Sequence, residues 1–146
     1  MLPGNNPATI DDKGRLKIPA IFRAEIESTW GSDFYVTSLT GDSVLVYPLP
    51  VWHEIEQKLA KLPTLNPTKK KFLDRTNFYG QVAAMDKSGR ILIPTLLRES
   101  AHMDGEVDVL GYLNNLEVWN HERFVSNLKE KNFTDADNET LGQLGI

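Results

Sequence analysis

Short stretches of alternating apolar and polar residues dominate the first fifty positions, and one helical stretch interrupts them. Alternation over a few residues is typical of half-buried strands, whereas apolar residues three or four apart indicate a helix. A returning strand after a tight turn predicts a local β-hairpin. The predicted elements are strands at 8–10, 15–18, 34–38 and 43–48 and a helix from Pro19 with Ile21, Phe22 and Ile26 on one side. Their order is β-β-α-β-β.

The same pattern occurs a second time, at an offset of 75 residues. Residues 10–23 read IDDKGRLKIPAIFR and residues 85–98 read MDKSGRILIPTLLR. The chain is therefore an internal duplication of one unit. The second copy predicts strands at 82–85, 90–93, 106–111 and 115–119 and a helix from Pro94. Six of the fourteen aligned positions are identical, namely Asp11/Asp86, Gly14/Gly89, Arg15/Arg90, Ile18/Ile93, Pro19/Pro94 and Arg23/Arg98.

The duplication predicts two units, 5–52 and 81–124, joined by a connector at 53–80. Apolar residues recur at helical spacing over 51–62, so the connector begins with a helix. Asn66-Pro67 then reads as an N-cap followed by a first-turn proline, which predicts a second helix. The fold class expected is α+β, mainly β, with connecting helices.

The remaining segment, 125–146, follows the second unit. A helix over 121–131 is expected to run into it, because residues 121–131 contain no proline or glycine. The tail FTDADNETLGQLGI is acidic, and we expect it to be mobile.

Neither unit is large enough to bury a deep core alone. The chain has 146 residues, of which 40% are hydrophobic and 25% charged, an ordinary globular composition. A unit of about 70 residues lies near the lower limit for independent folding. We therefore expect the two units to pack on each other or on other copies of the chain, and the second arrangement would be a homo-oligomer.

Composition and the N-terminal sequence indicate the cellular compartment. The chain has no cysteine, which excludes disulfides, thiolate metal sites and thiol catalysis. No apolar run approaches the ~20 residues needed to cross a bilayer. The N-terminus MLPGNNPATI lacks the basic and apolar regions of a secretion signal. A cytoplasmic protein without a membrane partner is expected.

Charge is unevenly distributed along the chain. The net charge of −4 argues against a nucleic-acid binder, because such domains are usually basic overall. Residues 61–100, however, hold 8 Lys and Arg against 3 Asp and Glu, a balance of +5, whereas the segments before and after it carry −3 and −6. The average therefore conceals a basic middle segment.

The sequence contains few of the motifs that form catalytic or metal-binding sites. His53, His102 and His121 are the only histidines, and none has the spacing of a metal-ligand pair. No nucleophile elbow or phosphate-binding glycine loop is present. The adjacent carboxylates Asp11 and Asp12 are not repeated in the second copy. We expect no catalytic residues, no metal and no cofactor.

What is repeated is an aspartate, three residues, then an arginine with a glycine before it. In the first copy these are Asp11, Gly14 and Arg15, and in the second Asp86, Gly89 and Arg90. The glycine supplies the positive φ of a tight turn, and the acid and arginine are placed to pair across it. One interpretation is a common surface ion pair of little consequence. The other is an arginine held at the turn to bind phosphate or guanine.

Neighbouring lysines favour the second interpretation. Lys13 and Lys17 flank the first arginine, and Lys87 precedes the second. Lys17 alternates with two apolar positions, so it is expected to point outward. A two-stranded ribbon with outward arginines and lysines fits the DNA major groove, where lysines meet phosphates and arginines reach bases.

Two other basic features remain open. The run Lys69-Lys70-Lys71 is more typical of a solvated helix face than of a site. The repeated pair Arg23 and Arg98 fits either salt bridges on the helices or the binding face. Aromatic residues in equivalent or periodic positions are expected to pack in the core or between subunits rather than to stack on bases.

The two motifs, the GR-L-IP pattern within them and the connector YPLPVWHEIEQKLAKLP together resemble the MraZ family of bacterial transcriptional regulators, which belong to the AbrB-like swapped-hairpin superfamily. The resemblance covers about residues 5–125. It implies two halves that interlock into a pseudo-twofold β-barrel within one chain. It also implies that Arg15 of the first motif, with Arg90 in the second, contacts DNA.

Further expectations follow from this resemblance alone. Family members resemble closed rings of many subunits, they bind short direct repeats in the promoter of the division and cell-wall gene cluster, and they act at the nucleoid. The two copies differ where contacts are expected, since Asp12 and Lys13 are replaced by Lys87 and Ser88. The copies are therefore expected to contact double-stranded DNA differently.

Two alternatives stay open at the level of sequence. The turns could mediate contacts between subunits or with another protein, which would make the chain a structural scaffold. An antitoxin-like module of the same superfamily would instead bind a small toxin encoded beside it. DNA binding through several phosphates weakens steeply with added salt, so salt dependence separates the leading hypothesis from these two.

Overall fold

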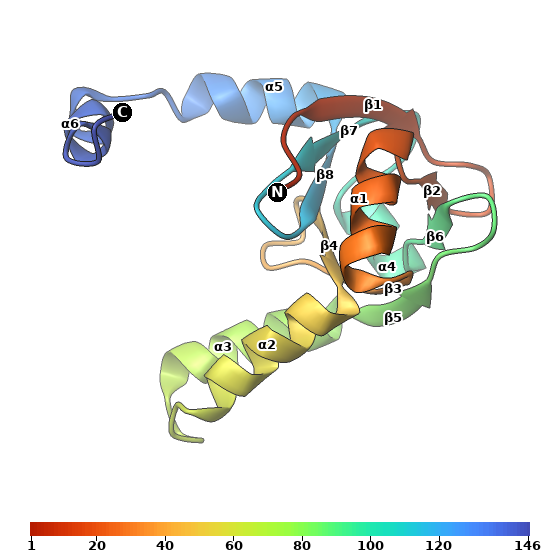
Figure 1. Ribbon diagram of the computed structural model, residues 1–146, viewed down its shortest axis with the longest axis horizontal. Coiled ribbons are helices and arrows are strands. Elements are labelled where there is room, and N and C mark those ends of the chain that lie inside the picture. Colours follow the sequence, from red (N-terminus) through yellow and green to blue (C-terminus); the bar gives the residue numbers. More distant parts are fainter.

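The computed structural model describes all residues, 1–146, as an α+β fold whose strands are antiparallel (Figure 1). The strands are β1 (Asn5–Thr9), β2 (Arg15–Lys17), β3 (Asp33–Thr37), β4 (Val44–Pro48), β5 (Gln81–Ala84), β6 (Arg90–Leu92), β7 (Glu106–Gly111) and β8 (Leu116–Asn120). The helices are α1 (Ala20–Trp30), α2 (Leu49–Ala60), α3 (Pro67–Phe78), α4 (Thr95–Ser100), α5 (His121–Glu130) and α6 (Asp135–Gly142). The order β-β-α-β-β occurs twice, as predicted.

The two copies exchange strands. Six strands form one sheet in the order β1-β7-β8-β4-β3-β5, so the first strand of each copy pairs with the third strand of the other copy. β1 and β5 are the free edges of this sheet, and its hydrogen bonds do not close it. The closed β-barrel implied by the resemblance is therefore not confirmed, whereas the mixed, mainly antiparallel fold is.

The predicted hairpins of β1 with β2 and of β5 with β6 are present only at their tight turns, where the N–H groups of Asp11 and Asp86 donate to the carbonyls of Arg15 and Arg90. Only one bridge, between Ile10 and Leu16, connects β1 to the strand that follows it, and β2 pairs instead with β6 as a separate two-stranded sheet. An isolated hairpin of such short strands is marginal in water. Pairing β2 with β6 places Leu16 opposite Ile91, and both side chains become fully buried.

One core serves both copies. Eighteen buried residues form a single cluster that draws on strands and helices of each. Burying a Leu, Ile, Val or Phe side chain contributes roughly 1.5–3 kcal/mol, so neither copy could keep this stabilisation after separation from the other. The cluster comprises Leu2, Leu16, Ile18, Phe22, Ile26, Phe34, Val36, Val44, Val46, Ile91, Ile93, Leu97, Ala101, Met103, Val107, Val109, Leu116 and Val118.

Helix α1 starts one residue later than the sequence predicts. Pro19 is the N-cap, with the extended ψ of 138°, and its carbonyl accepts hydrogen bonds from the N–H groups of Phe22 and Arg23. Phe22 and Ile26 face the core, but Ile21 is 66% exposed, so its predicted position on the buried side is wrong. At 3.6 residues per turn, Ile21 lies about 100° around the helix from Phe22.

Helices α2 and α3 form a pair that projects from the sheet (Figure 1). Trp52 stacks on Tyr35 at a centroid distance of 4.5 Å and on Phe72 at 6.1 Å, which attaches both helices to β3. Asn66 caps α3 by accepting hydrogen bonds from two backbone N–H groups, as its sequence predicts. The aromatic residues here pack against one another, as expected.

The C-terminal helices extend from the opposite side (Figure 1). His121, at the start of α5, bonds through Nδ1 to the buried Asp108 on β7 at 2.8 Å. The tail predicted to be mobile contains helix α6, because Thr134 and Asp137 form a reciprocal capping box at its N-terminus. None of the helices is both long and apolar enough to cross a membrane.

Candidate nucleic-acid interface

Strands β2 and β6 form a short ribbon beside two turns that lie at the same end of the molecule (Figure 1). The register places Arg15 opposite Leu92 and Lys17 opposite Arg90. These four side chains share the outer face of the ribbon, because Leu16 and Ile91 between them point into the core. Like charges at Lys17 and Arg90 repel each other, which is tolerable where an anion is bound.

The first turn, residues 11–15, is built around one carboxylate. Asp11 Oδ1 accepts hydrogen bonds from the N–H groups of Lys13 at 3.0 Å and Arg15 at 2.8 Å. Asp11 Oδ2 accepts a further bond from Arg15 Nε at 2.8 Å. Gly14 takes a φ of +83°, which closes the turn. The predicted pairing of acid and arginine is present here.

The second turn, residues 86–90, repeats the backbone but not the ion pair. Asp86 Oδ1 accepts hydrogen bonds from the N–H groups of Ser88 at 2.8 Å and Arg90 at 2.9 Å, and Gly89 has a φ of +81°. The side chain of Arg90 makes no hydrogen bond or ion pair. The predicted clip is therefore wrong for the second copy.

Asp86 instead approaches the arginine of the first turn. Its Oδ2 lies 3.9 Å from Arg15 Nη1, so Arg15 stands between two carboxylates, one from each turn. Pairing across the ribbon brings the turns close enough for this contact. Arg15 is thus oriented from two sides, whereas Arg90 is unconstrained.

Both aspartates are stabilised as carboxylates. The pKa of Asp11 is lowered from its usual 3.8, chiefly by the hydrogen bond from the Arg15 N–H and further by the Arg15 side chain. The pKa of Asp86 is also lowered, chiefly by the N–H of Arg90, and the charge of Arg15 contributes a smaller effect. Both turns therefore keep their negative charge at neutral pH, where the guanidinium groups are always charged.

The sequence left open whether Arg23 and Arg98 form salt bridges on their helices or belong to the binding face. In the structure, each packs against the turn of the other copy. Gly14 and Gly89 are buried although they lie in turns. A Cβ at Gly14 would collide with the guanidinium of Arg98, and one at Gly89 would lie 2.9 Å from Arg23 Nη1. Their repetition was the only signal in the sequence that pointed to them.

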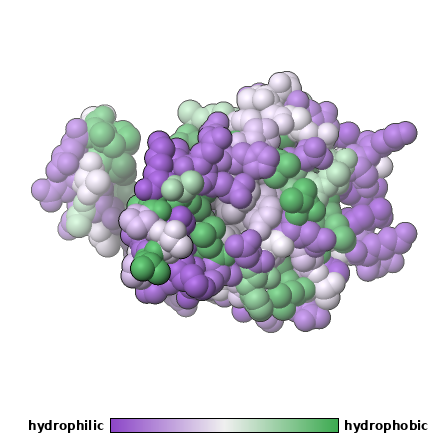
Figure 2. All heavy atoms as spheres, turned by 90° about the horizontal axis from the view of Figure 1, so that it is seen from below, coloured by the Kyte–Doolittle hydropathy of each residue, from purple (hydrophilic) through white to green (hydrophobic).

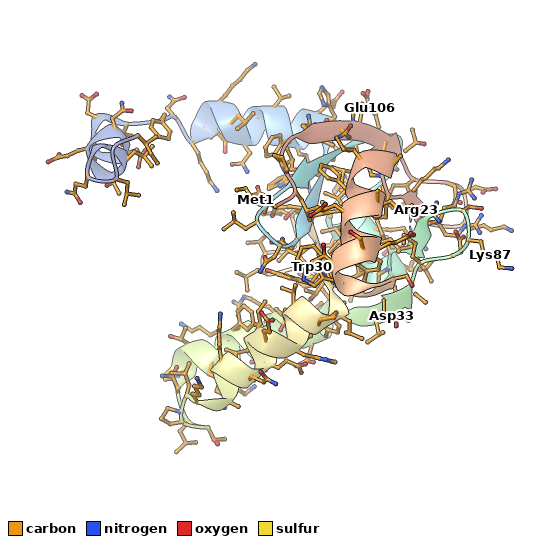
Figure 3. All side chains as sticks on the ribbon, viewed as in Figure 1. Met1, Arg23, Trp30, Asp33, Lys87 and Glu106 are labelled. Atoms are coloured by element: carbon orange, nitrogen blue, oxygen red, sulfur yellow. The ribbon has the colours of Figure 1, made fainter.

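Hydrogen bonds fix both arginines in these positions. Arg23 Nη2 donates to the carbonyl of Lys87 at 3.1 Å, and its Nε pairs with Glu27 at 2.8 Å. Figure 3 shows Arg23 between α1 and the loop that carries Lys87. Arg98 Nε donates to the carbonyl of Ile93 at 2.9 Å, and its Nη2 donates to Thr95 Oγ1.

The three predicted lysines, Lys13, Lys17 and Lys87, are all exposed near the ribbon. Hydrophilic side chains project from that end of the molecule in Figure 2. The run Lys69-Lys70-Lys71 lies on α3, and Lys70 pairs with Asp74 within the same helix. Figure 1 shows that α3, which carries this run, lies away from the ribbon. The predicted aspartates, glycines and arginines lie together in the two turns.

The structure contains no cluster of side chains suited to bind a metal ion. No three His, Asp or Glu side chains lie close enough to share a metal ion. A cleft of about 540 Å³ beside α5 is open and polar, and Trp119 is its one hydrophobic lining residue. The ribbon and its turns are the candidate site.

Comparison with known proteins points to one family. The family model described as "MraZ protein, putative antitoxin-like" matches residues 1–75 and 81–144. A protein of Acidobacterium capsulatum is 48% identical over 146 residues, and one of Koribacter versatilis is 50% identical over 147, each comparison covering both chains completely. A protein of Moorella thermoacetica is 40% identical and covers 89% of this chain and 88% of its own. All three are named transcriptional regulator MraZ.

Proposed function

The chain belongs to the MraZ family, and on that premise we propose that it is a sequence-specific, DNA-binding transcriptional regulator rather than an enzyme. The observation that carries the proposal is the paired turns, which present Arg15 and Arg90 on one ribbon. A two-stranded ribbon fits the major groove of B-DNA, where arginine can bond to O6 and N7 of guanine.

The two arginines differ in their ion pairs, and this difference supports a different task for each. Arg15 Nε is occupied by Asp11, which leaves the terminal amino groups in a fixed plane for a bidentate base contact. Arg90 is unpaired and can follow the phosphate backbone. The exposed lysines, Lys13, Lys17 and Lys87, add phosphate contacts that position the ribbon.

We further propose the target and the architecture that the family implies. The target is a set of short direct repeats in the promoter of the division and cell-wall gene cluster, which places the protein in the cytoplasm at the nucleoid. The exchange of β1 and β5 between units 5–52 and 81–124 supports a double swapped-hairpin architecture. Segments 53–80 and 125–146 then serve as connector and C-terminal arm.

Gel-shift titration with the DNA upstream of the gene tests this function. Losing a bidentate base contact costs ~1–3 kcal/mol, so Arg15→Ala should weaken specific binding roughly tenfold to a hundredfold. Arg90→Ala should weaken binding to all sequences and reduce its salt dependence. Unchanged affinity of the double variant would refute this site. No shift of the upstream DNA even at low salt would favour a protein partner, the scaffold or antitoxin-like alternative.

Self-association in a ring is the second part of the proposal. The C-terminal arm exposes apolar side chains that no other element covers, namely Val125, Leu128, Phe133, Leu144 and Ile146. Figure 2 shows apolar atoms on the separate body at the left, where Figure 1 places α6. Its acids Asp135, Asp137 and Glu139 complement the basic run on α3. A second copy of the chain supplies both surfaces, and tandem binding raises avidity by ~10²–10⁴.

A charge exchange tests this contact. Replacing Lys69, Lys70 and Lys71 with glutamate should reduce the mass of the assembly in analytical ultracentrifugation. Replacing Asp135 and Glu139 with lysine, which leaves the capping box of Thr134 and Asp137 intact, should do the same. Combining both sets should restore it. Single sets without effect, or a combination without recovery, would place the subunit contact elsewhere.

A further inference from the structure

We propose that Arg23 and Arg98 are positioning residues that act across the duplication, each holding the DNA-contacting turn of the other copy. The inference rests on the proposed function, because it concerns how the two turns are presented to DNA. Arg23 belongs to α1 but supports the turn at 86–90, and Arg98 belongs to α4 but supports the turn at 11–15.

Contacts at the turn glycines carry the inference. The guanidinium of Arg98 lies flat against Gly14, where a Cβ would overlap it, and Gly14 is buried beneath this side chain. Arg23 lies against Gly89 less closely, with Nη1 2.9 Å from where a Cβ would be, and also donates to the carbonyl of Lys87 at 3.1 Å. Glycine is thus required at both positions for close approach as well as for its positive φ.

A backbone link adds to each contact. The N–H of Ile93, two residues before α4, donates to the carbonyl of Gly14 at 3.0 Å, and the N–H of Ile18 donates to the carbonyl of Gly89 at 2.8 Å. Arg98 Nε in turn binds the carbonyl of Ile93. Arg98, Ile93 and Gly14 therefore form a connected set, which ends at the residue immediately before Arg15.

Both arginines have two of their three side-chain nitrogen atoms engaged within the protein. Arg98 uses Nε and Nη2, and Arg23 uses Nε and Nη2 as well. A side chain whose donors are already engaged in this way contributes to DNA binding by fixing a neighbour rather than by direct contact. Loss of either arginine should release one turn, and the affected turn is the one in the other copy.

The first experiment follows backbone amides by NMR in the absence of DNA. Arg98→Ala should shift the amide signals of Gly14 and Arg15 and leave Gly89 and Arg90 largely unchanged, whereas Arg23→Ala should do the reverse. Arg98→Lys should not restore the signals, because an ammonium group lacks the planar face that packs on Gly14. Arg123→Ala, an arginine that contacts Ser100 away from the turns, is the matched control.

The second experiment measures DNA affinity in double-mutant cycles. Arg98→Ala should weaken binding about threefold to tenfold, as expected when an immobilised side chain loses its order. Its effect should be non-additive with Arg15→Ala and additive with Arg90→Ala. Arg23→Ala should show the opposite pattern. Additivity of Arg98→Ala with both would indicate direct DNA contact and overturn the proposal.

The two readouts separate this inference from the proposed function. Suppose that each arginine variant shifts the amide signals of the turn in the other copy, but the protein does not bind the upstream DNA. This result would refute DNA binding and still show that Arg23 and Arg98 hold the turns. Specific DNA binding without these amide shifts would refute the positioning role alone. Shifts confined to the turn of the same copy would also overturn it.

Discussion

The two turns have the same backbone conformation, but their arginines differ in the number of contacts that hold them. In the turn at 11–15, Arg15 is oriented by Asp11 and approached by Asp86, whereas in the turn at 86–90 Arg90 has no partner. The same difference appears beneath the turns, since Arg98 fits more tightly against Gly14 than Arg23 fits against Gly89. The two copies thus share a scaffold, but the first copy holds its arginine by ion pairs and the second does not.

Alanine at the turn glycines should have the largest effect. Gly14→Ala forces a Cβ into the guanidinium of Arg98 at a φ of +83°, and we expect a loss of about 2–3 kcal/mol in the free energy of unfolding. Gly89→Ala meets Arg23 at 2.9 Å rather than 2.3 Å, so the arginine has less far to move and the change should cost about 1–2 kcal/mol. Urea denaturation monitored by circular dichroism measures both.

A control separates φ strain from the collision. Gly105 has a φ of +70° and nothing near its Cβ position, so Gly105→Ala reports the backbone cost alone, about 1–2 kcal/mol. If Gly14→Ala costs no more than Gly105→Ala, Arg98 yields easily and the two turns are equally well held.

Substituting asparagine for the turn aspartates should have the next largest effect. Asp11→Asn keeps an oxygen for the backbone N–H groups but weakens the anchor on Arg15. We expect discrimination between specific and unrelated DNA to fall about threefold to tenfold, because Arg15 must then be ordered on binding. Asp86→Asn should change discrimination less, since its contact with Arg15 is 3.9 Å long.

Removing a negative charge also strengthens attraction to phosphate, so both variants should bind unrelated DNA more tightly. Affinity must therefore be compared on both DNAs at one salt concentration. Equal losses of discrimination in the two variants would show that Arg15 and Arg90 contribute alike, contrary to the asymmetry of the turns.

The carboxyl pKa values provide a smaller but direct measure of the same asymmetry. Arg15→Ala should raise the pKa of Asp11, because the side-chain hydrogen bond and the charge of Arg15 are lost while its backbone N–H remains, and it should raise the pKa of Asp86 less. Arg90→Ala should raise only that of Asp86. Carbon-detected NMR titration measures the four values, and a rise in Asp11 after Arg90→Ala would contradict the geometry.

The lowered pKa values of Asp11 and Asp86 make the free energy of unfolding depend on pH. A carboxyl with a pKa below its unfolded value contributes stability that is present above that value, 3.8, and is lost as the pH falls through the lower folded pKa. Acid unfolding of the wild type should therefore be steeper below about pH 4 than that of the Asp11→Asn, Asp86→Asn double variant.

Much of the secondary structure could be predicted from sequence, but not the pairing of the strands. Alternation located β3, β4, β7 and β8 to within a residue or two, and Asn66 marked the start of α3. Alternation does not identify the partner of a strand, so β2 was matched to its neighbour β1 rather than to β6. The exposed Ile21 shows the same limit, because periodicity could not fix which side of α1 meets the core.

The part of the candidate site that is close in sequence could be predicted, and the contacts between the two copies could not. The aspartate, glycine and arginine of each turn are close in sequence, and a repeated local spacing made them visible. Arg98 lies far from Gly14 in the chain, and only the exchange of strands brings them together. The contact of Asp86 with Arg15 was equally hidden, because it joins the two copies.

Glu27→Gln should have the smallest effect and tests whether Arg23 depends on its own helix. Glu27 pairs with Arg23 Nε at 2.8 Å across one turn of α1, a contact worth roughly 0.3–0.5 kcal/mol on a helix surface. The position equivalent to Glu27 in the second copy is His102, and Arg98 binds Thr95 and a carbonyl instead. Glu27→Gln should therefore loosen only the turn at 86–90, seen as faster amide exchange of Gly89 with no change at Gly14. Equal exchange at both glycines would mean that the turns are coupled through the ribbon, and the contrast between the two copies would then fail.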